Sequence, residues 1–222
     1  MSGQLNLDLQ VRTWGGKRAG AGRPRREQQH DSPHVKRPKH VGRHPLHVVL
    51  RTVAGAPNLR TLACYAAIRF VLARTRDDFR IVHLSIQKNH LHFIIEATDR
   101  IALTRGMRSV GVSLAHAIGR ATGHRGKVFA YRFHATAITS PRQMHNTLAY
   151  VLNNWRKHRE DRDSTAYLDR YSSALAFDGW ELRFAIPTDY LPLPVSVART
   201  WLASVGWRRH GIIDSHRCPQ RA

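Results

Sequence analysis

Residues 86–96 read Ile-Gln-Lys-Asn-His-Leu-His-Phe-Ile-Ile-Glu, and the fold is best understood outward from this stretch. Histidines alternate here with large apolar residues, which is the pattern of a β-strand whose two faces lie in different surroundings. His90 and His92 fall on one face, about 7 Å apart, so both can bind one divalent cation. The alternative is that they only cover a solvated sheet face, since no third ligand lies nearby in the sequence.

The flanking sequence predicts a succession of strands and helices. Lys88-Asn89 separates two apolar runs and indicates a tight hairpin, and Asn58 is a suitable N-cap for the first helix. Strand, helix, strand, strand, helix and strand are expected at residues 45–53, 58–76, 79–87, 90–97, 100–122 and 131–139. This order predicts an α+β, ferredoxin-like (split β-α-β) fold: a four-stranded antiparallel sheet with helices on one face.

A further helix is expected to begin at Ser140. The serine suits an N-cap, proline follows at the first helical position, and glutamine stands three residues after the cap. One apolar stripe is then formed by Met144, Leu148, Val151 and Trp155. Tyr150 and Asn154 are one turn apart and lie off this stripe. A helical tyrosine usually serves packing, but the neighbouring amide favours a functional site.

The charge of the chain indicates its partner, and its composition divides it into three parts. The chain of 222 residues has 36 Lys and Arg against 15 Asp and Glu, a net charge of +21. Such an excess is typical of proteins that bind nucleic acid, although ribosome-associated and membrane-surface proteins share it. We expect a disordered basic arm over 1–44, a domain over 45–160 and a C-terminal extension over 161–222.

Smaller features add expectations about the arm, the extension and the compartment. Residues 15–25 resemble part of an AT-hook, and a generic phosphate-binding tail fits them equally. A helix is expected over 195–205, and 206–210 could stack on bases or pack as a lid. No apolar run is long enough to span a membrane, no signal core begins the chain, and only two cysteines occur. These features predict a cytoplasmic protein.

Two motifs together resemble a known family. Asn89-His90-Leu91-His92, followed by Tyr150-Val151-Leu152-Asn153-Asn154, resembles the single-tyrosine HUH transposases. The branch associated with repetitive extragenic palindromes is most similar, since 15–25 and 131–135 also look like it. The resemblance covers roughly residues 40–160 and implies that 45–160 form the single-tyrosine nuclease and transposase domain.

The resemblance implies a DNA transposase and single-strand endonuclease. It would cleave and rejoin hairpin-associated single-stranded DNA through a 5′-phosphotyrosine intermediate, with Tyr150 as nucleophile. The metal ligands would be His90, His92 and Asn154, holding Mg²⁺ or Mn²⁺. DNA contacts are expected from Lys17, Arg18, Arg23, Arg25, Arg132, His134 and Lys157. The implied partners are single-stranded and hairpin DNA. The implied localisation is the bacterial cytoplasm, in association with the nucleoid. The oligomeric state is undecided between monomer and homodimer.

Two alternatives remain at this point. A ferredoxin-like sheet with basic arms could bind DNA or RNA hairpins without catalysis, although such sheets display aromatics, not histidines, at the centre of the open face. Glu96 lies on the histidine face of its strand and could support the metal ligands. We favour a structural role for Glu96 at the strand end.

Overall fold

A computed structural model describes residues 40–73, 77–130, 132–162 and 166–218. The expected disorder over 1–44 falls almost entirely outside these residues. No helix in the described part of the chain is both long enough and apolar enough to cross a membrane.

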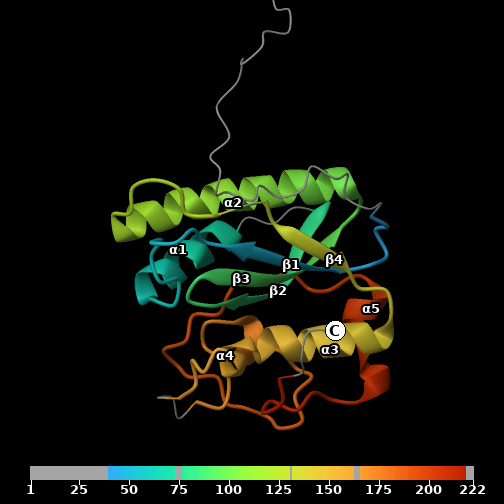
Figure 1. Cartoon of the computed structure of the whole chain (residues 1–222). Coiled ribbons are helices and arrows are strands. Elements are labelled where there is room, and N and C mark those ends of the chain that lie inside the picture. Colours follow the sequence, from blue (N-terminus) through green and yellow to red (C-terminus); the bar gives the residue numbers. More distant parts are fainter. Residues whose placement is uncertain (1–39, 74–76, 131, 163–165, 219–222) are drawn as a thin grey trace, which may run out of the picture. The chain divides into compact units, whose positions relative to one another are not determined.

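A single four-stranded antiparallel sheet organises the described residues (Figure 1). Its strands are β1 (Leu46–Arg51), β2 (Phe79–Ile86), β3 (His90–Ala97) and β4 (His134–Ala137). Their spatial order is β2-β3-β1-β4, and every neighbouring pair is antiparallel. This confirms the ferredoxin-like arrangement, with β1 and β3 at the centre.

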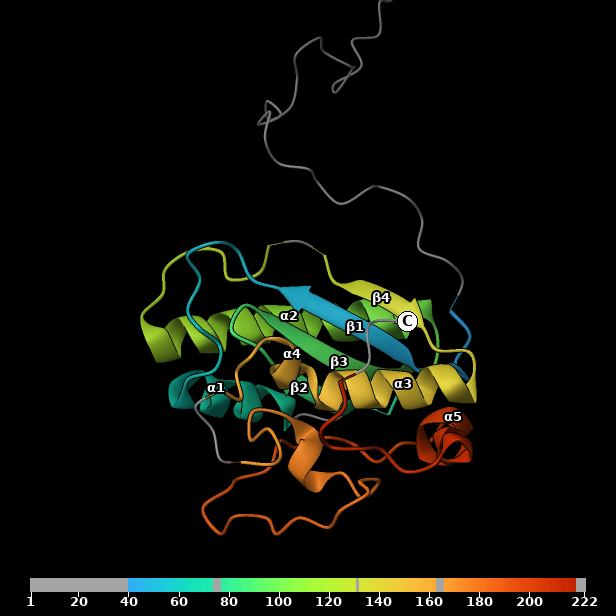
Figure 2. The same cartoon turned by 60° about the horizontal axis from the view of Figure 1, so that its bottom comes forward.

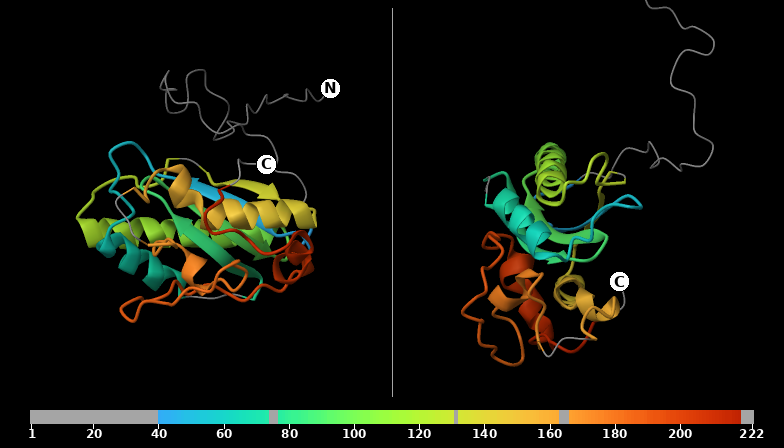
Figure 3. Two further views of the ribbon diagram at one scale, coloured as in Figure 1. Left: turned by 90° about the horizontal axis from the view of Figure 1, so that it is seen from below. Right: turned by 90° about the vertical axis from the view of Figure 1, so that its left-hand side faces the viewer.

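Two long helices cover one face of the sheet. α1 (Leu62–Leu72) and α2 (Arg100–Thr122) lie side by side on that face (Figures 1 and 3). α2 ends as expected at Gly123, whose φ of 70° is the left-handed conformation that glycine adopts readily. The predicted N-cap of α1 is wrong. Thr61 caps the helix, because its side chain accepts the N–H of Cys64. The Asn58 side chain instead accepts the N–H of Arg60 in the turn before the helix.

The pleat of β3 separates the two kinds of side chain as the sequence predicts. Leu91, Phe93 and Ile95 are fully buried in the core beneath α1 and α2. His90 and His92 point to the opposite face. The hairpin is also confirmed, because the N–H of Gln87 donates to the carbonyl of His90 across the Lys88-Asn89 turn.

A third helix lies on the histidine face of the sheet (Figure 2). α3 (Pro141–Leu152) begins at the predicted cap, where Ser140 Oγ accepts the N–H of Gln143. The expected continuous stripe through Trp155 is wrong, because α3 ends at Leu152 and a one-turn helix, α4 (Asn154–Lys157), follows. Asn153 stands at the break, and its amide donates to the carbonyls of Asp214 and Arg217 near the chain end.

The C-terminal extension packs beside α3 and forms a second core. This core contains Leu168, Trp180, Leu202, Trp207 and Ile213, together with apolar residues of α3. The extension contains η1 (Ser173–Ala176), α5 (Trp201–Ser204) and η2 (Gly206–His210). Trp207 is 1% exposed, so it packs and cannot stack on bases.

The helix expected over 195–205 is wrong in length, because α5 starts only after Thr200. Both oxygens of Glu96 accept from this segment: Thr200 donates its N–H and its hydroxyl, and Arg199 donates its N–H. The carboxylate therefore fixes Arg199 and Thr200 ahead of the helix. Burial alone would raise the pKa of Glu96, but hydrogen bonds from Thr200, Arg199 and Arg80 hold it below its ordinary value.

Candidate active site

Tyr150 lies in the last turn of α3 and faces the sheet. Its ring meets the rings of His92 and His47 edge-on, with centroids 5.4 Å and 5.8 Å away. The Nζ of Lys157 lies 4.9 Å from the ring centroid. The side chain is 8% exposed, and within the described residues its hydroxyl makes no hydrogen bond. The phenol is thus held by ring contacts, while its oxygen is available to a substrate.

The two histidines of β3 converge on one point. His90 Nε2 lies 3.0 Å from His92 Nε2. Their other ring nitrogens are occupied, because Asn89 Oδ1 lies 2.7 Å from His90 Nδ1 and His47 Nε2 lies 3.0 Å from His92 Nδ1. Burial, followed by the charges of His158 and Arg51, lowers the pKa of His90 to about 4. This imidazole is therefore neutral at neutral pH, as a metal ligand must be.

The donor set fits a divalent cation bound by few protein ligands. Within the described residues, no group of three or more His, Cys, Asp or Glu side chains could hold a metal ion. Asn154 is fully buried, and both of its amide atoms have no hydrogen-bond partner. The amide oxygen of Asn154 is therefore not used by any hydrogen bond within the described residues. Two imidazoles and one amide oxygen suit an ion that keeps its other positions for substrate or water.

A cleft of about 610 Å³ opens above these histidines. Its lining is strongly basic and includes Arg51, Arg132 and Lys157, and no acidic side chain occurs among its described lining residues. The lining consists of Val49, Arg51, Asn89, His90, His92, Arg132, His134, Tyr150, Lys157 and His158. Such a cleft favours an anionic ligand.

The cleft brings together most, but not all, of the residues predicted from the sequence. His90, His92, Tyr150 and the expected DNA contacts Arg132, His134 and Lys157 all line it. Asn154 is close to Tyr150 in sequence, but it is fully buried and is not part of the lining. Lys17, Arg18, Arg23 and Arg25 lie outside the described residues.

Two histidines of the site were missed by the sequence analysis. His47 on β1 contacts His92, and His158 lies after α4 with its ring centroid 5.0 Å from that of His90. Burial, then Lys157 and Arg51, lower the pKa of His158, against an opposing effect of Glu160. Strand alternation could have identified His47, because it stands between the apolar Leu46 and Val48. The sequence carried no comparable signal for His158, which depends on the helix break.

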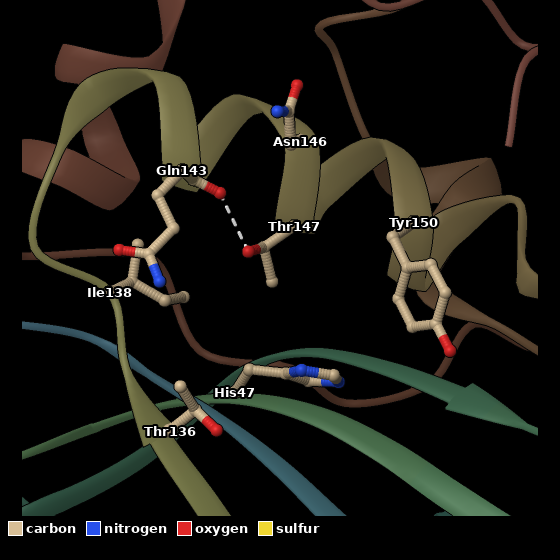
Figure 4. A pocket seen from close by; sticks show the side chains of 7 residues that line it. All are labelled: His47, Thr136, Ile138, Gln143, Asn146, Thr147 and Tyr150. Atoms are coloured by element: carbon tan, nitrogen blue, oxygen red, sulfur yellow. Dashed lines mark hydrogen bonds between the residues drawn. The ribbon is translucent and has the colours of Figure 1, made fainter. Parts of the chain in front are cut away.

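A small hollow adjoins the cleft between α3 and the sheet (Figure 4). Its volume is about 50 Å³, which leaves room for a few water molecules. Figure 4 shows Tyr150 and Thr147 on the helix above, and His47 and Thr136 on the strands below. Tyr150 lines both this hollow and the cleft.

A second basic cavity lies at the other end of α3. It has a volume of about 620 Å³ and is lined by Arg43, Arg80, Arg199 and Trp201, among others. Trp201 is 48% exposed, and the guanidinium of Arg209 lies 4.8 Å from its ring centroid. An exposed indole among arginines can stack on an unpaired base while the cations bind phosphate.

Comparisons with known proteins find structural likenesses but no sequence match. No family model matches the chain, and no curated protein matches it. One solved structure that it resembles is described as the REP-associated tyrosine transposase bound to a REP hairpin. The likeness covers 57% of this chain and 74% of that chain, with 20% sequence identity and a TM-score of 0.46. A similarity of this size does not assign a function to this chain.

Proposed function

We propose that the protein is a metal-dependent transposase that cleaves and rejoins single-stranded DNA beside hairpins. The observation that carries this proposal is the basic cleft, in which Tyr150 lies against a pair of converging histidines. A phenol, a metal-ligand pair and cationic side chains are the groups that phosphoryl transfer to tyrosine requires.

Tyr150 acts as the nucleophile. Its phenol oxygen bonds to the scissile phosphorus, the bond from phosphorus to the 3′ oxygen breaks, and the released oxygen takes up a proton. The DNA is left with a free 3′-OH and a 5′ end attached to the protein. Because the phosphodiester energy is kept in this link, a 3′-OH can reverse the step and join strands without a nucleotide cofactor.

Arg132 and Lys157 bind the phosphate beside Tyr150. Both side chains are exposed at the cleft surface, so they can reach DNA without first losing a buried ion pair. Their charges offset the negative charge that develops on the phosphate oxygens during attack. A phenol has an ordinary pKa near 10, so a strongly polarised phosphate is needed for attack at neutral pH.

His90, His92 and Asn154 are the ligands for Mg²⁺ or Mn²⁺. When bound, the divalent ion supplies further polarisation of the phosphate. An amide is a weaker ligand than a carboxylate, so we expect modest affinity and additional coordination by the substrate. Because Asn154 does not line the cleft, its side chain has to turn toward the histidines for its oxygen to take part.

Unpaired DNA fits the described surface better than a duplex. Tyr150 is 8% exposed at the floor of the cleft, so a phosphate must enter to reach it. A flexible single strand can do so, whereas a paired strand is held away by its complement. The cavity around Trp201 offers a second contact for the same strand, and the basic arm adds non-specific affinity.

The test is covalent attachment to DNA. The full chain is incubated with single-stranded, hairpin and duplex oligonucleotides, with Mg²⁺, with Mn²⁺ or with a chelator, and is run on a denaturing gel. We expect a metal-dependent protein–DNA band with unpaired substrates and little with duplex. Tyr150→Phe removes one oxygen and little packing, so it should still bind DNA but give no band.

A non-catalytic hairpin binder would give a different result. It would bind the same oligonucleotides with no covalent band under any metal condition. The sheet is less suited to that role, because α3 and the C-terminal extension cover the face that an RNA-binding sheet leaves open.

A further inference from the structure

Four side chains whose ring or amide atoms lie within hydrogen-bond distance of one another form a row across the sheet beneath Tyr150. The row begins at His47 on β1, passes through His92 and His90 on β3, and ends at Asn89 in the β2–β3 turn. The three successive distances are 3.0, 3.0 and 2.7 Å. Asn89, His90 and His92 belong to the sequence motif at residues 89–92. His47 lies far from them in the sequence and reaches them through the pairing of β1 with β3.

The outer members of this row decide which nitrogen of each ligand faces the cleft. Asn89 Oδ1 only accepts hydrogen bonds, so it places the proton of neutral His90 on Nδ1 and leaves Nε2 as a lone pair. Without an ion, the 3.0 Å contact with this lone pair requires a proton on His92 Nε2. His92 can offer Nε2 to the same ion only if its proton is on Nδ1 instead, so the ion would take the place of the contact between the two Nε2 atoms. His92 Nδ1 faces His47 Nε2, which must then accept.

Packing holds both outer members in place. The His47 ring stacks on that of His92, with centroids 5.2 Å apart and planes 19° apart, and the residue is 7% exposed. Asn89 is exposed, but its backbone is fixed because the N–H and hydroxyl of Thr52 donate to its carbonyl at 2.9 Å and 3.0 Å. Each acceptor therefore stays near its histidine before any ion binds.

We propose that His47 and Asn89 are the positioning residues of the metal site. His47 accepts from Nδ1–H of His92, Asn89 accepts from Nδ1–H of His90, and both Nε2 lone pairs are thereby directed at one ion. The inference rests on the proposed function, since it requires that His90 and His92 bind a metal. Such outer partners are worth about 10- to 100-fold in metal affinity in other proteins.

The experiment is a titration of the full chain with Mn²⁺ without DNA, followed by electron paramagnetic resonance. His47→Phe fills the same space but cannot accept, so we expect affinity to fall by about 10- to 100-fold. His47→Gln places an amide oxygen near the lost nitrogen and should restore most of the affinity. Asn89→Leu and Asn89→Asp form the matching pair at the exposed end of the row. Thr136→Val is the control, because Thr136 on β4 is the strand partner of His47 but is not a member of this row of side chains.

The outcomes separate this inference from the proposed function. Equal Mn²⁺ affinity in wild type, His47→Phe and Asn89→Leu would overturn the inference while leaving the histidine site intact. A fall in melting temperature without a change in affinity would give His47 a purely structural role and would overturn it too. If wild type and a His90→Ala/His92→Ala double variant bind Mn²⁺ alike, the metal site itself fails. Should His47→Phe not fold, the exposed Asn89 variants decide the question.

Discussion

Replacing Glu96 with glutamine tests whether this carboxylate serves the fold or the metal site. The side chain is 2% exposed and accepts from Thr200 N (2.7 Å), Thr200 Oγ1 (2.7 Å), Arg199 N (3.0 Å) and Arg80 Nη2 (2.6 Å). Glutamine keeps the size but loses the charge, and its NH₂ group must face donors. Hydrogen bonds to charged groups contribute about 1.5–3 kcal/mol each, and removing one partner of a buried pair costs about 3–5 kcal/mol.

We expect Glu96→Gln to lower the free energy of unfolding by about 3 kcal/mol. This is the lower end of the range for breaking a buried ion pair, because the Arg80 side chain can still reach solvent when its partner is lost. The folded pKa of Glu96 is lowered, so its stabilisation is present above the ordinary value of 4.5 and is lost as pH falls through the folded pKa. The difference between wild type and variant should therefore shrink below pH 4.5.

Urea unfolding at pH 7 and at pH 4 measures both effects. Asp77→Asn is the control: Asp77 is 99% exposed and pairs loosely with Arg199 at 3.8 Å, so no measurable change is expected. Mn²⁺ affinity should be the same in Glu96→Gln and wild type. A stability change below about 1 kcal/mol, or a large loss of Mn²⁺ affinity, would refute the structural role.

Four further changes address the histidines, the amide, the second cavity and the arm. Burial lowers the pKa of His83 from 6.5 to about 4, although the nearby acids Asp178 and Glu96 act in the opposite direction. The unfolded chain therefore binds a proton more readily than the folded protein, and the free energy of unfolding decreases as the pH is lowered below 6.5. His83→Gln should remove this part of the decrease, measured as the difference between urea unfolding at pH 7 and at pH 5. Asn154→Ala should slow cleavage and be partly rescued by excess Mn²⁺, whereas Asn154→Asp should stay active; equal rates in all three proteins would contradict the amide ligand. Trp201→Ala should weaken binding of single-stranded DNA by about tenfold in a fluorescence titration, and unchanged affinity would exclude stacking there. Deleting residues 1–40 should weaken DNA binding and flatten its dependence on salt, and an identical slope would rule out phosphate contacts by the arm.

Local signals were sufficient to predict the sheet and its histidines. The alternation in β3 and the Ser140 cap of α3 depend on residues a few positions apart, and the structure confirms both. The order of elements then restricted the topology to the split β-α-β arrangement. The prediction that Asn58 caps α1 was wrong because Asn58 and Thr61, three residues apart, are both suitable N-caps. Only the three-dimensional path of the backbone decides between them.

Features that depend on contacts distant in sequence could not be predicted. Strand alternation marks His47 itself, but its contact with His92 follows from the pairing of β1 with β3, which the sequence near the two residues does not reveal. The break after α3 is stabilised by Asn153 hydrogen bonds to Asp214 and Arg217, about sixty residues away, and this break brings His158 to the cleft. The sequence of the C-terminal extension lacks a clear helical or strand periodicity of apolar residues, because its buried residues lie in loops and short helical turns.

Mass spectrometry of the covalent DNA adduct tests the central claim most directly. Trypsin places each of the six tyrosines in a different peptide, and Tyr150 is the only one in peptide 143–156. After digestion of the adduct formed with single-stranded DNA and Mn²⁺, we expect the nucleotide mass on that peptide and its disappearance in Tyr150→Phe. A nucleotide on the peptide of Tyr131 or Tyr167, or an adduct that persists in Tyr150→Phe, would contradict Tyr150 as the nucleophile.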